Sequence, residues 1–152
     1  DDLDYRVARR EAHRADNALV LAWQDMQVEP HKQHQFQQQA FTLTYLNHAL
    51  LSYLSALGAH REQQQVPNLE LLHFANGISE ALHEANQAIW SRIHTQNKDL
   101  QTILEQIRQH INESEQGFAR MQFTLLYNIA DVTIQLLQQA KLINKNDEAN
   151  QK

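Results

Sequence analysis

Residues 40–57, AFTLTYLNHALLSYLSAL, decide the fold of this chain. They lie inside a longer segment, Gln33 to His60, that contains no Asp, Glu, Lys or Arg. A helix drawn through this segment is apolar on most of its faces, which is typical of a helix in the middle of a bundle. Its polar side chains would be costly in lipid but can bond to neighbouring helices and water. We therefore predict a central bundle helix and not a membrane span.

The segments on either side show the apolar spacing of amphipathic helices. Between Asp4 and Pro30, apolar residues recur at alternating intervals of three and four, and we expect this row to face a neighbouring helix. The row consists of Tyr5, Ala8, Ala12, Ala15, Leu19, Ala22 and Met26. Three further helices are predicted from about Leu69 to Ile93, from Leu100 to Ile111 and from Phe118 to Leu142.

Prolines and short polar stretches separate these segments. Pro30 and Pro67 disfavour helical geometry at the residue before each of them, and Asn68 is then a natural N-cap. The stretches TQNKD at 95–99 and NESEQG at 112–117 interrupt the apolar pattern. Each of these positions therefore predicts a boundary between two helices.

The composition favours a single all-helical domain. The chain has 152 residues but only 3 Gly and 2 Pro, too few for a sheet joined by tight turns. Hydrophobic residues make up 42% of it, enough for a core. We predict an elongated up-down bundle of about five amphipathic helices over residues 1–143. The polar end, residues 144–152, is predicted to be a disordered tail.

Charge and residue usage exclude several classes of function. The net charge of −5 argues against a nucleic-acid partner, which normally meets a basic excess. The absence of cysteine excludes disulfides, thiolate metal sites and cysteine nucleophiles. There is no glycine-rich phosphate loop, and no serine sits between flanking glycines on a strained turn. We predict no catalytic residue and no cofactor.

A ferritin-like metal protein is the alternative hypothesis. The pairs Glu70/His73 and Glu80/His83 have the Glu-x-x-His spacing of di-iron carboxylate bundles. Both pairs fall on the same predicted helix, about 15 Å apart along its axis, whereas such centres take their pairs from two helices. We therefore interpret them as surface pairs and predict no metal site, although the chain has 9 His.

The first predicted helix carries a local basic ridge on an acidic chain. Arg6, Arg9, Arg10 and Arg14, with His13, fall on one stripe at ~100° per residue, which we place opposite the alanine-rich row. A solvated face paired with nearby acidic residues is one interpretation of this ridge. The other is contact with anionic lipid head groups or with an acidic partner surface.

Two stretches of sequence resemble a known family. Residues 5–19, YRVARREAHRADNAL, followed by Val28-Glu29-Pro30, and residues 47–61, NHALLSYLSALGAHR, resemble the C-terminal domain of the YccS/YhfK-type bacterial inner-membrane proteins. These belong to the wider fusaric acid resistance and aromatic acid exporter-like group. The resemblance implies two transmembrane bundles, each followed by a cytoplasmic region. It implies no catalytic or ligand-binding residue.

The function predicted from this resemblance is non-catalytic. We expect a soluble cytoplasmic domain of an inner-membrane efflux transporter, with a role in assembly or regulation. The start at Asp1-Asp2-Leu3, without a Met, suggests a fragment of a longer chain. The expected partners are the rest of its own membrane-embedded chain, a second copy in a homo-oligomer, and anionic lipid head groups.

Overall fold

The computed structural model describes residues 2–28, 34–60, 68–91, 99–114 and 117–150. Within these ranges the side chains of residues 2, 34–36, 88–91 and 144–150 are not described. The described residues form the helices α1 (Asp2–Val28), α2 (His34–Ala59), α3 (Leu69–Ser91), α4 (Asp99–Glu113) and α5 (Phe118–Asn150). The predicted all-α fold is confirmed.

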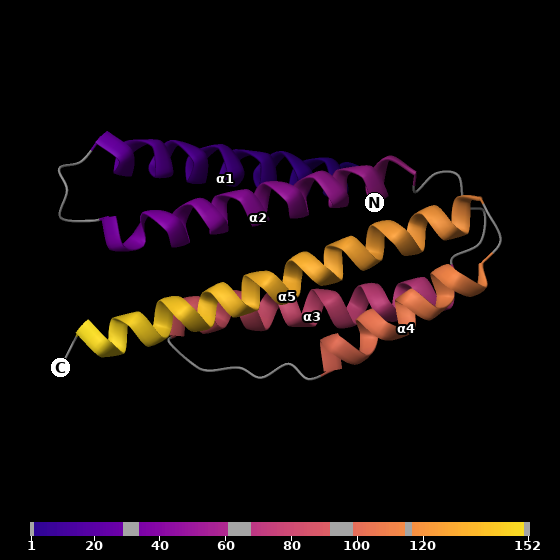
Figure 1. Cartoon of the computed structure of the whole chain (residues 1–152). Helices are drawn as coiled ribbons and strands as arrows, with labels where there is room; N and C mark the ends of the chain where they lie inside the picture. Colours follow the sequence, from indigo (N-terminus) through magenta and orange to yellow (C-terminus); the bar gives the residue numbers. More distant parts are fainter. Residues whose placement is uncertain (1, 29–33, 61–67, 92–98, 115–116, 151–152) are drawn as a thin grey trace.

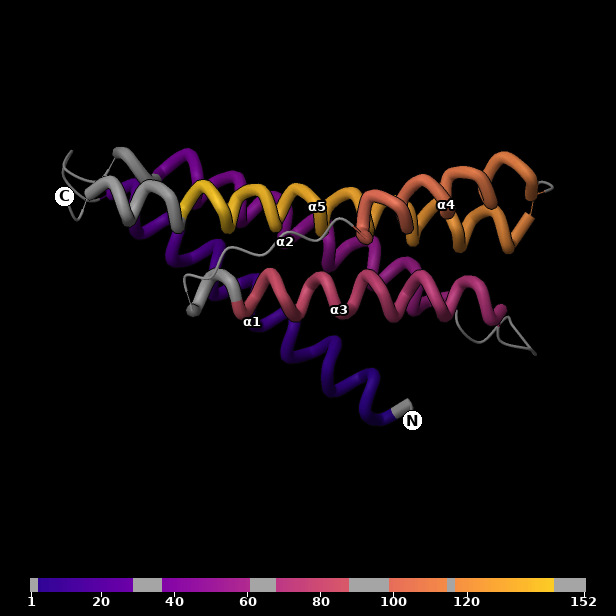
Figure 2. Tube along the Cα trace, turned by 90° about the horizontal axis from the view of Figure 1, so that it is seen from below, coloured from indigo at the N-terminus to yellow at the C-terminus, as the bar shows by residue number. Residues whose placement is uncertain are grey.

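Successive helices run in alternating directions, and the bundle is elongated along them (Figure 1). The hairpin of α1 and α2 forms one layer, and α3, α4 and α5 form the other. Seen from below, the N-terminal half of α1 diverges from the remaining helices (Figure 2). The contacts of α1 are mainly with α2. The up-down arrangement agrees with the sequence prediction, and α1 is the outlying helix.

The core is organised around α5, which packs against α2, α3 and α4. Its Leu126, Ile129 and Thr133 are among the largest fully buried side chains of the protein. As predicted, α2 lies between two other helices, because it packs against both α1 and α5. It nevertheless exposes Phe41 and Tyr45. The apolar character of α2 therefore exceeds what its two neighbours cover.

The predicted row on α1 is only partly right. Tyr5, Leu19 and Met26 are half-buried, as expected for a row that faces α2. Ala15 and Ala22 are exposed, whereas Asp16 is buried and Trp23 is half-buried. At these two positions of the row, the residue of α1 that meets α2 is therefore the one that follows the predicted alanine. The physical reason is that a carboxylate and an indole, not the alanines, make the contacts between the two helices.

The predicted N-cap at Asn68 and the predicted break between the fourth and fifth helices are confirmed, whereas Pro30, Pro67 and residues 95–98 lie outside the described residues. The Oδ1 atom of Asn68 accepts hydrogen bonds from the backbone N–H groups of Glu70 at 3.0 Å and Leu71 at 3.2 Å, which is the geometry of an N-cap. Gly117, between α4 and α5, has a φ of 150°, a conformation that other residues rarely adopt.

The last helix runs further than the sequence indicated. We predicted an end near Leu142, and the backbone of α5 remains helical to Asn150. The side chains from residue 144 onward lie outside the description, and so do residues 151 and 152. The disordered tail over 144–152 stays a prediction.

A close contact joins the start of α1 to the end of α2. The ring of Tyr5 lies directly against Gly58, in the space that a Cβ atom on residue 58 would occupy. A glycine inside a helix costs about 1 kcal/mol relative to alanine. The absence of a side chain at position 58 is what lets the tyrosine approach the α2 backbone.

We predict that Gly58→Ala destabilises the protein although alanine is the better helix former. The new methyl group would collide with the Tyr5 ring, and such overpacking costs about 1–3 kcal/mol. Urea unfolding followed by circular dichroism measures the loss. In a Tyr5→Ala background the same glycine substitution should be neutral or stabilising by about 1 kcal/mol. Equal destabilisation in both backgrounds would show that the contact is not the cause.

Candidate functional site

A buried carboxylate connects α1 with α2. The side chain of Asp16, 3% exposed, lies between the two helices. Its Oδ1 accepts a hydrogen bond from Asn47 Nδ2 at 3.0 Å, and its Oδ2 is 2.8 Å from His48 Nδ1. Both carboxylate oxygens therefore have partners, as burial of a charged group requires. The outer side of the His48 ring faces solvent, since this side chain is 68% exposed.

Further contacts continue the same antiparallel pairing along both helices. Towards the end of α1, the rings of Trp23 and Phe41 lie 5.5 Å apart, and Gln37 Nε2 donates to the Met26 carbonyl at 3.5 Å. At the other end, Tyr5 meets Gly58. The pairing thus has a polar centre and aromatic contacts towards both ends.

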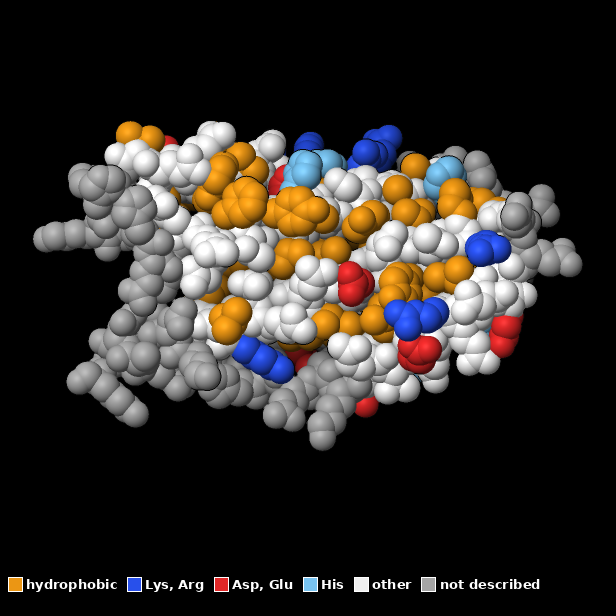
Figure 3. Space-filling view, viewed as in Figure 1, with side chains coloured by type: hydrophobic (Ala, Val, Ile, Leu, Met, Phe, Trp, Pro, Cys, Tyr) orange, Lys and Arg blue, Asp and Glu red, His pale blue; other side chains and the backbone are white. Residues whose placement is uncertain are grey.

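The structure divides the predicted basic ridge between two places. All four arginines are exposed, and basic side chains gather over the N-terminal half of α1 (Figure 3). Arg10 and Arg14 both pair with Glu11, at 3.8 and 3.3 Å. Arg9 instead lines a groove between α1 and α2 together with Ala8 and Ala12. The expectation that the whole ridge lies opposite the alanine-rich row is therefore wrong for Arg9.

The outer face of α1 is more apolar than the sequence analysis recognised. Several of its large apolar side chains are exposed, namely Leu3 (57%), Val7 (42%), Leu21 (59%) and Val28 (86%). Leu3 and Val7 lie near the arginines, and Leu21 and Val28 lie beyond them along the helix. Their spacings of four, fourteen and seven residues place all four on one side of a helix, which was the available signal, but the alanine row on the same helix drew attention from it.

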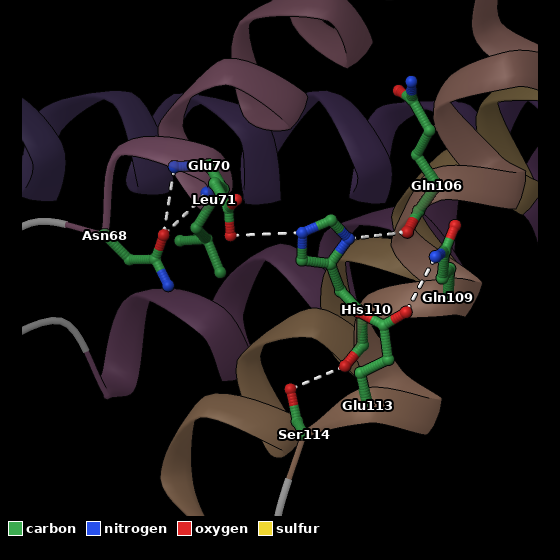
Figure 4. Close-up of polar contacts among 8 residues, drawn as sticks. All are labelled: Asn68, Glu70, Leu71, Gln106, Gln109, His110, Glu113 and Ser114. Atoms are coloured by element: carbon green, nitrogen blue, oxygen red, sulfur yellow. Dashed lines mark hydrogen bonds and ion pairs between the residues drawn. The ribbon is translucent and has the colours of Figure 1, made fainter.

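A second polar cluster joins α3 to α4 (Figure 4). Glu70 belongs to the first turn of α3, held in place by the Asn68 cap, and His110 belongs to the last turn of α4. The His110 Nε2 atom is 3.1 Å from Glu70 Oε2, and its Nδ1 is 2.8 Å from the Gln106 carbonyl oxygen. No sequence pattern indicates this pair, because its members are 40 residues apart along the chain and meet only through the packing of two helices.

The environment of His110 favours its protonated form. The hydrogen bond to the Gln106 carbonyl raises the pKa of His110 above its ordinary value, partial burial acts in the opposite direction, and the Glu70 carboxylate raises it further. The rings of Phe74 and Phe123 lie 5.3 Å from the imidazole. The Glu70–His110 pair lines an open pocket of about 460 Å³.

The two Glu-x-x-His motifs have other partners than a shared ion. Glu70 and His73 line the pocket of His110, while His83 Nε2 is 2.9 Å from Gln87 Nε2. Among the residues that the structure describes, no three His, Asp or Glu side chains converge on a point that would suit a metal. The arrangement of the described motifs gives the ferritin-like hypothesis no support.

Sequence comparison links the chain to membrane proteins. It is 45% identical to the inner membrane protein YccS of Escherichia coli over 85 residues, which cover 53% of this chain and 12% of that protein. The chain is related to YccS. An uncharacterized protein of Haemophilus influenzae is 34% identical over 150 residues, covering 91% of this chain and 20% of its own length. No family model and no solved structure matches the chain.

The two YccS-like stretches of the sequence analysis face each other in the structure. Residues 5–19 lie in α1, and the described part of residues 47–61 lies at the C-terminal half of α2 and just after it. Asp16 of the first stretch bonds to Asn47 and His48 at the start of the second. In the described parts of the chain, no helix is both long and apolar enough to cross a membrane.

We predict that His110 stabilises the protein more at low pH. Since its pKa is higher in the folded than in the unfolded chain, the contribution is fully present below the unfolded value of about 6.5 and is lost as the pH rises through the folded value. His110→Gln should cost up to about 1 kcal/mol at pH 5.5 and less at pH 8.5, because the pair is partly solvated. Urea unfolding of variant and parent at both pH values measures this, and a cost that is the same at both would contradict it.

Proposed function

We propose that the chain is a cytoplasmic domain of an inner-membrane efflux transporter, with a role in assembly or regulation and no catalysis of its own. The observation that carries this proposal is the 45% identity to an inner membrane protein. The chain spans 12% and 20% of the lengths of the relatives it matches. In this proposal the remaining length of such a protein holds the membrane-embedded part, and the five helices described here form a unit attached to it.

The charge of α1 supports a cytoplasmic position. Lys and Arg next to membrane helices are enriched on the cytoplasmic side of the membrane. Arg6, Arg9, Arg10 and Arg14 are concentrated in the first half of α1 and are all exposed. Arg10 and Arg14, together with the apolar side chains Leu3 and Val7, form an outer surface that suits contact with the head groups of an inner leaflet or with another protein surface, and Arg9 lies at the rim of the neighbouring groove.

The outlying position of α1 supports a role in assembly. This helix is held mainly by α2, and its outer face carries the exposed side chains of Leu3, Val7, Leu21 and Val28. Exposed apolar groups of this kind mark surfaces that associate with a partner. The proposed partners are the rest of the same chain and a second copy of it.

The described lining of the pocket around His110 consists of Leu69, Glu70, His73, Phe74, Gln106, Gln109 and His110. Among these described residues an imidazole and a carboxylate meet without a serine, threonine or lysine beside them. We assign the Glu70–His110 pair a structural role in joining α3 to α4.

The upstream reading frame and the topology of the full-length parent test this proposal. Several apolar runs of about 20 residues are expected outside this chain, and a start codon a few residues before Asp1 would contradict the proposal. The chain has 0 Cys, so Val28→Cys, at a position 86% exposed, adds a single label site in this region. In a parent cleared of other cysteines, a membrane-impermeant maleimide should label this site in inside-out vesicles and not in intact cells.

Permeabilised cells are the control for the labelling experiment, because the site must react once the membrane is opened. Labelling in intact cells without permeabilisation would place the domain on the opposite side of the membrane, and the cytoplasmic proposal would then be abandoned.

We also predict weak binding of the chain to anionic vesicles at low salt. A basic residue near an anionic surface contributes about 1 kcal/mol, and the attraction is screened within a Debye length of about 8 Å at physiological ionic strength. Changing Arg6, Arg9, Arg10 and Arg14 to Gln should abolish co-sedimentation with phosphatidylserine vesicles and leave the helical circular dichroism unchanged, because all four side chains are exposed.

Replacement of the same four residues by Lys is the matched control, since it keeps the charge and should keep the binding. If the Gln variant still binds, or if it unfolds, the arginines do not act as a lipid-facing ridge.

A further inference from the structure

The groove between α1 and α2 has a volume of about 240 Å³. Its lining is almost wholly apolar and consists of Tyr5, Ala8, Arg9, Ala12, Leu51, Leu54 and Ser55. We propose that this groove binds the alkyl chain of a small anionic amphiphile, of the class of medium-chain carboxylates. The inference goes beyond the proposed function and does not depend on it.

The groove lies between two points at which α1 and α2 are in contact. On one side Tyr5 rests on Gly58, and on the other Asp16 bonds to Asn47 and His48. Between these contacts α1 lines the groove with the methyl groups of Ala8 and Ala12 and with Arg9 at the rim. The short alanine side chains do not reach across to fill the gap. The resulting space exceeds the ~150 Å³ of a cavity that holds benzene.

The shape of the groove fits a chain. Its α1 wall extends from Tyr5 to Ala12, about 10 Å along the axis at 1.5 Å per residue. On α2 the wall is formed by Leu51, Leu54 and Ser55, one turn of helix. Leu54 is 41% exposed, so an apolar ligand in the groove would also cover a leucine that is now in contact with water.

Two polar groups of the lining point to an anionic end on the ligand. The Oγ atom of Ser55 is buried and has no hydrogen-bond partner among the described residues. A buried hydroxyl without a partner is uncommon, and a ligand oxygen would satisfy it. Arg9 is the charged residue of the lining and is exposed, so its guanidinium group is available at the rim. Guanidinium binds carboxylate in a bidentate manner and repels a cationic head.

Octanoate is the probe for this site. Titration into the 15N-labelled 152-residue chain should shift amide signals of the groove residues with 1:1 stoichiometry. Acetate has the head without the chain, and octyltrimethylammonium has the chain with the opposite charge; both should bind at least tenfold more weakly. Equal binding of either compound would overturn the proposal, because chain and negative charge would then not be recognised together.

Substitutions in the groove separate the two parts of the recognition. Ala12→Leu fills the groove and should weaken octanoate binding at least tenfold, whereas Ala18→Leu, at an exposed alanine of the same helix, should leave it unchanged. Arg9→Gln should weaken octanoate binding about tenfold and leave the binding of the uncharged 1-octanol unaltered. Because Arg9 is exposed, this second variant is informative even if Ala12→Leu does not fold.

The outcomes distinguish the source of the ligand and can refute the site. Competition between octanoate and phosphatidylserine vesicles would identify a lipid acyl chain as an occupant, and its absence would identify a free carboxylate. Octanoate binding that survives Ala12→Leu in the folded variant, or that responds equally to Ala18→Leu, would place the ligand elsewhere and refute the proposal.

Discussion

The carboxylate of Asp16 is the constraint on which the surfaces of this protein depend. It is 3% exposed, and Asn47 and His48 of α2 satisfy its two oxygens. A buried carboxylate tolerates few positions, because sliding or rotating α1 would leave it without partners at a cost of several kcal/mol. The hydrogen bonds therefore specify the register of α1 on α2. Apolar contacts alone would specify it less sharply, since many alanines and leucines are interchangeable in packing.

This constraint matters because α1 is held mainly by α2. The core of the protein is built around α5, whose buried side chains meet α2, α3 and α4. Among the described residues of α1, Asp16 is the one that reaches full burial. The helix keeps most of its surface accessible, which is what a contact surface in an assembly requires.

The sequence was sufficient to predict the elements but not their faces. Local chemistry was enough to predict the start of the third helix, where the Asn68 cap is confirmed, while the prolines at 30 and 67 lie outside the described residues. The row on α1 was predicted from apolar residues alone, and a buried aspartate is indistinguishable from a solvated one in such a pattern. The Glu70–His110 pair could not be predicted, because it joins two helices whose relative register depends on packing.

The displaced row also explains how the arginines are divided. Had Ala15 and Ala22 faced α2, all four arginines would have formed one outer stripe. With Asp16 and Trp23 on that face instead, Arg9 turns towards the groove, and Arg10 and Arg14 remain outside with Glu11. Consecutive residues of a helix point about 100° apart, so a contact row that uses Asp16 and Trp23 beside Tyr5, Leu19 and Met26 lies nearer to Arg9 than the predicted row does. The single hydrogen-bonded carboxylate thus decides which arginine belongs to the groove and which belong to the outer face.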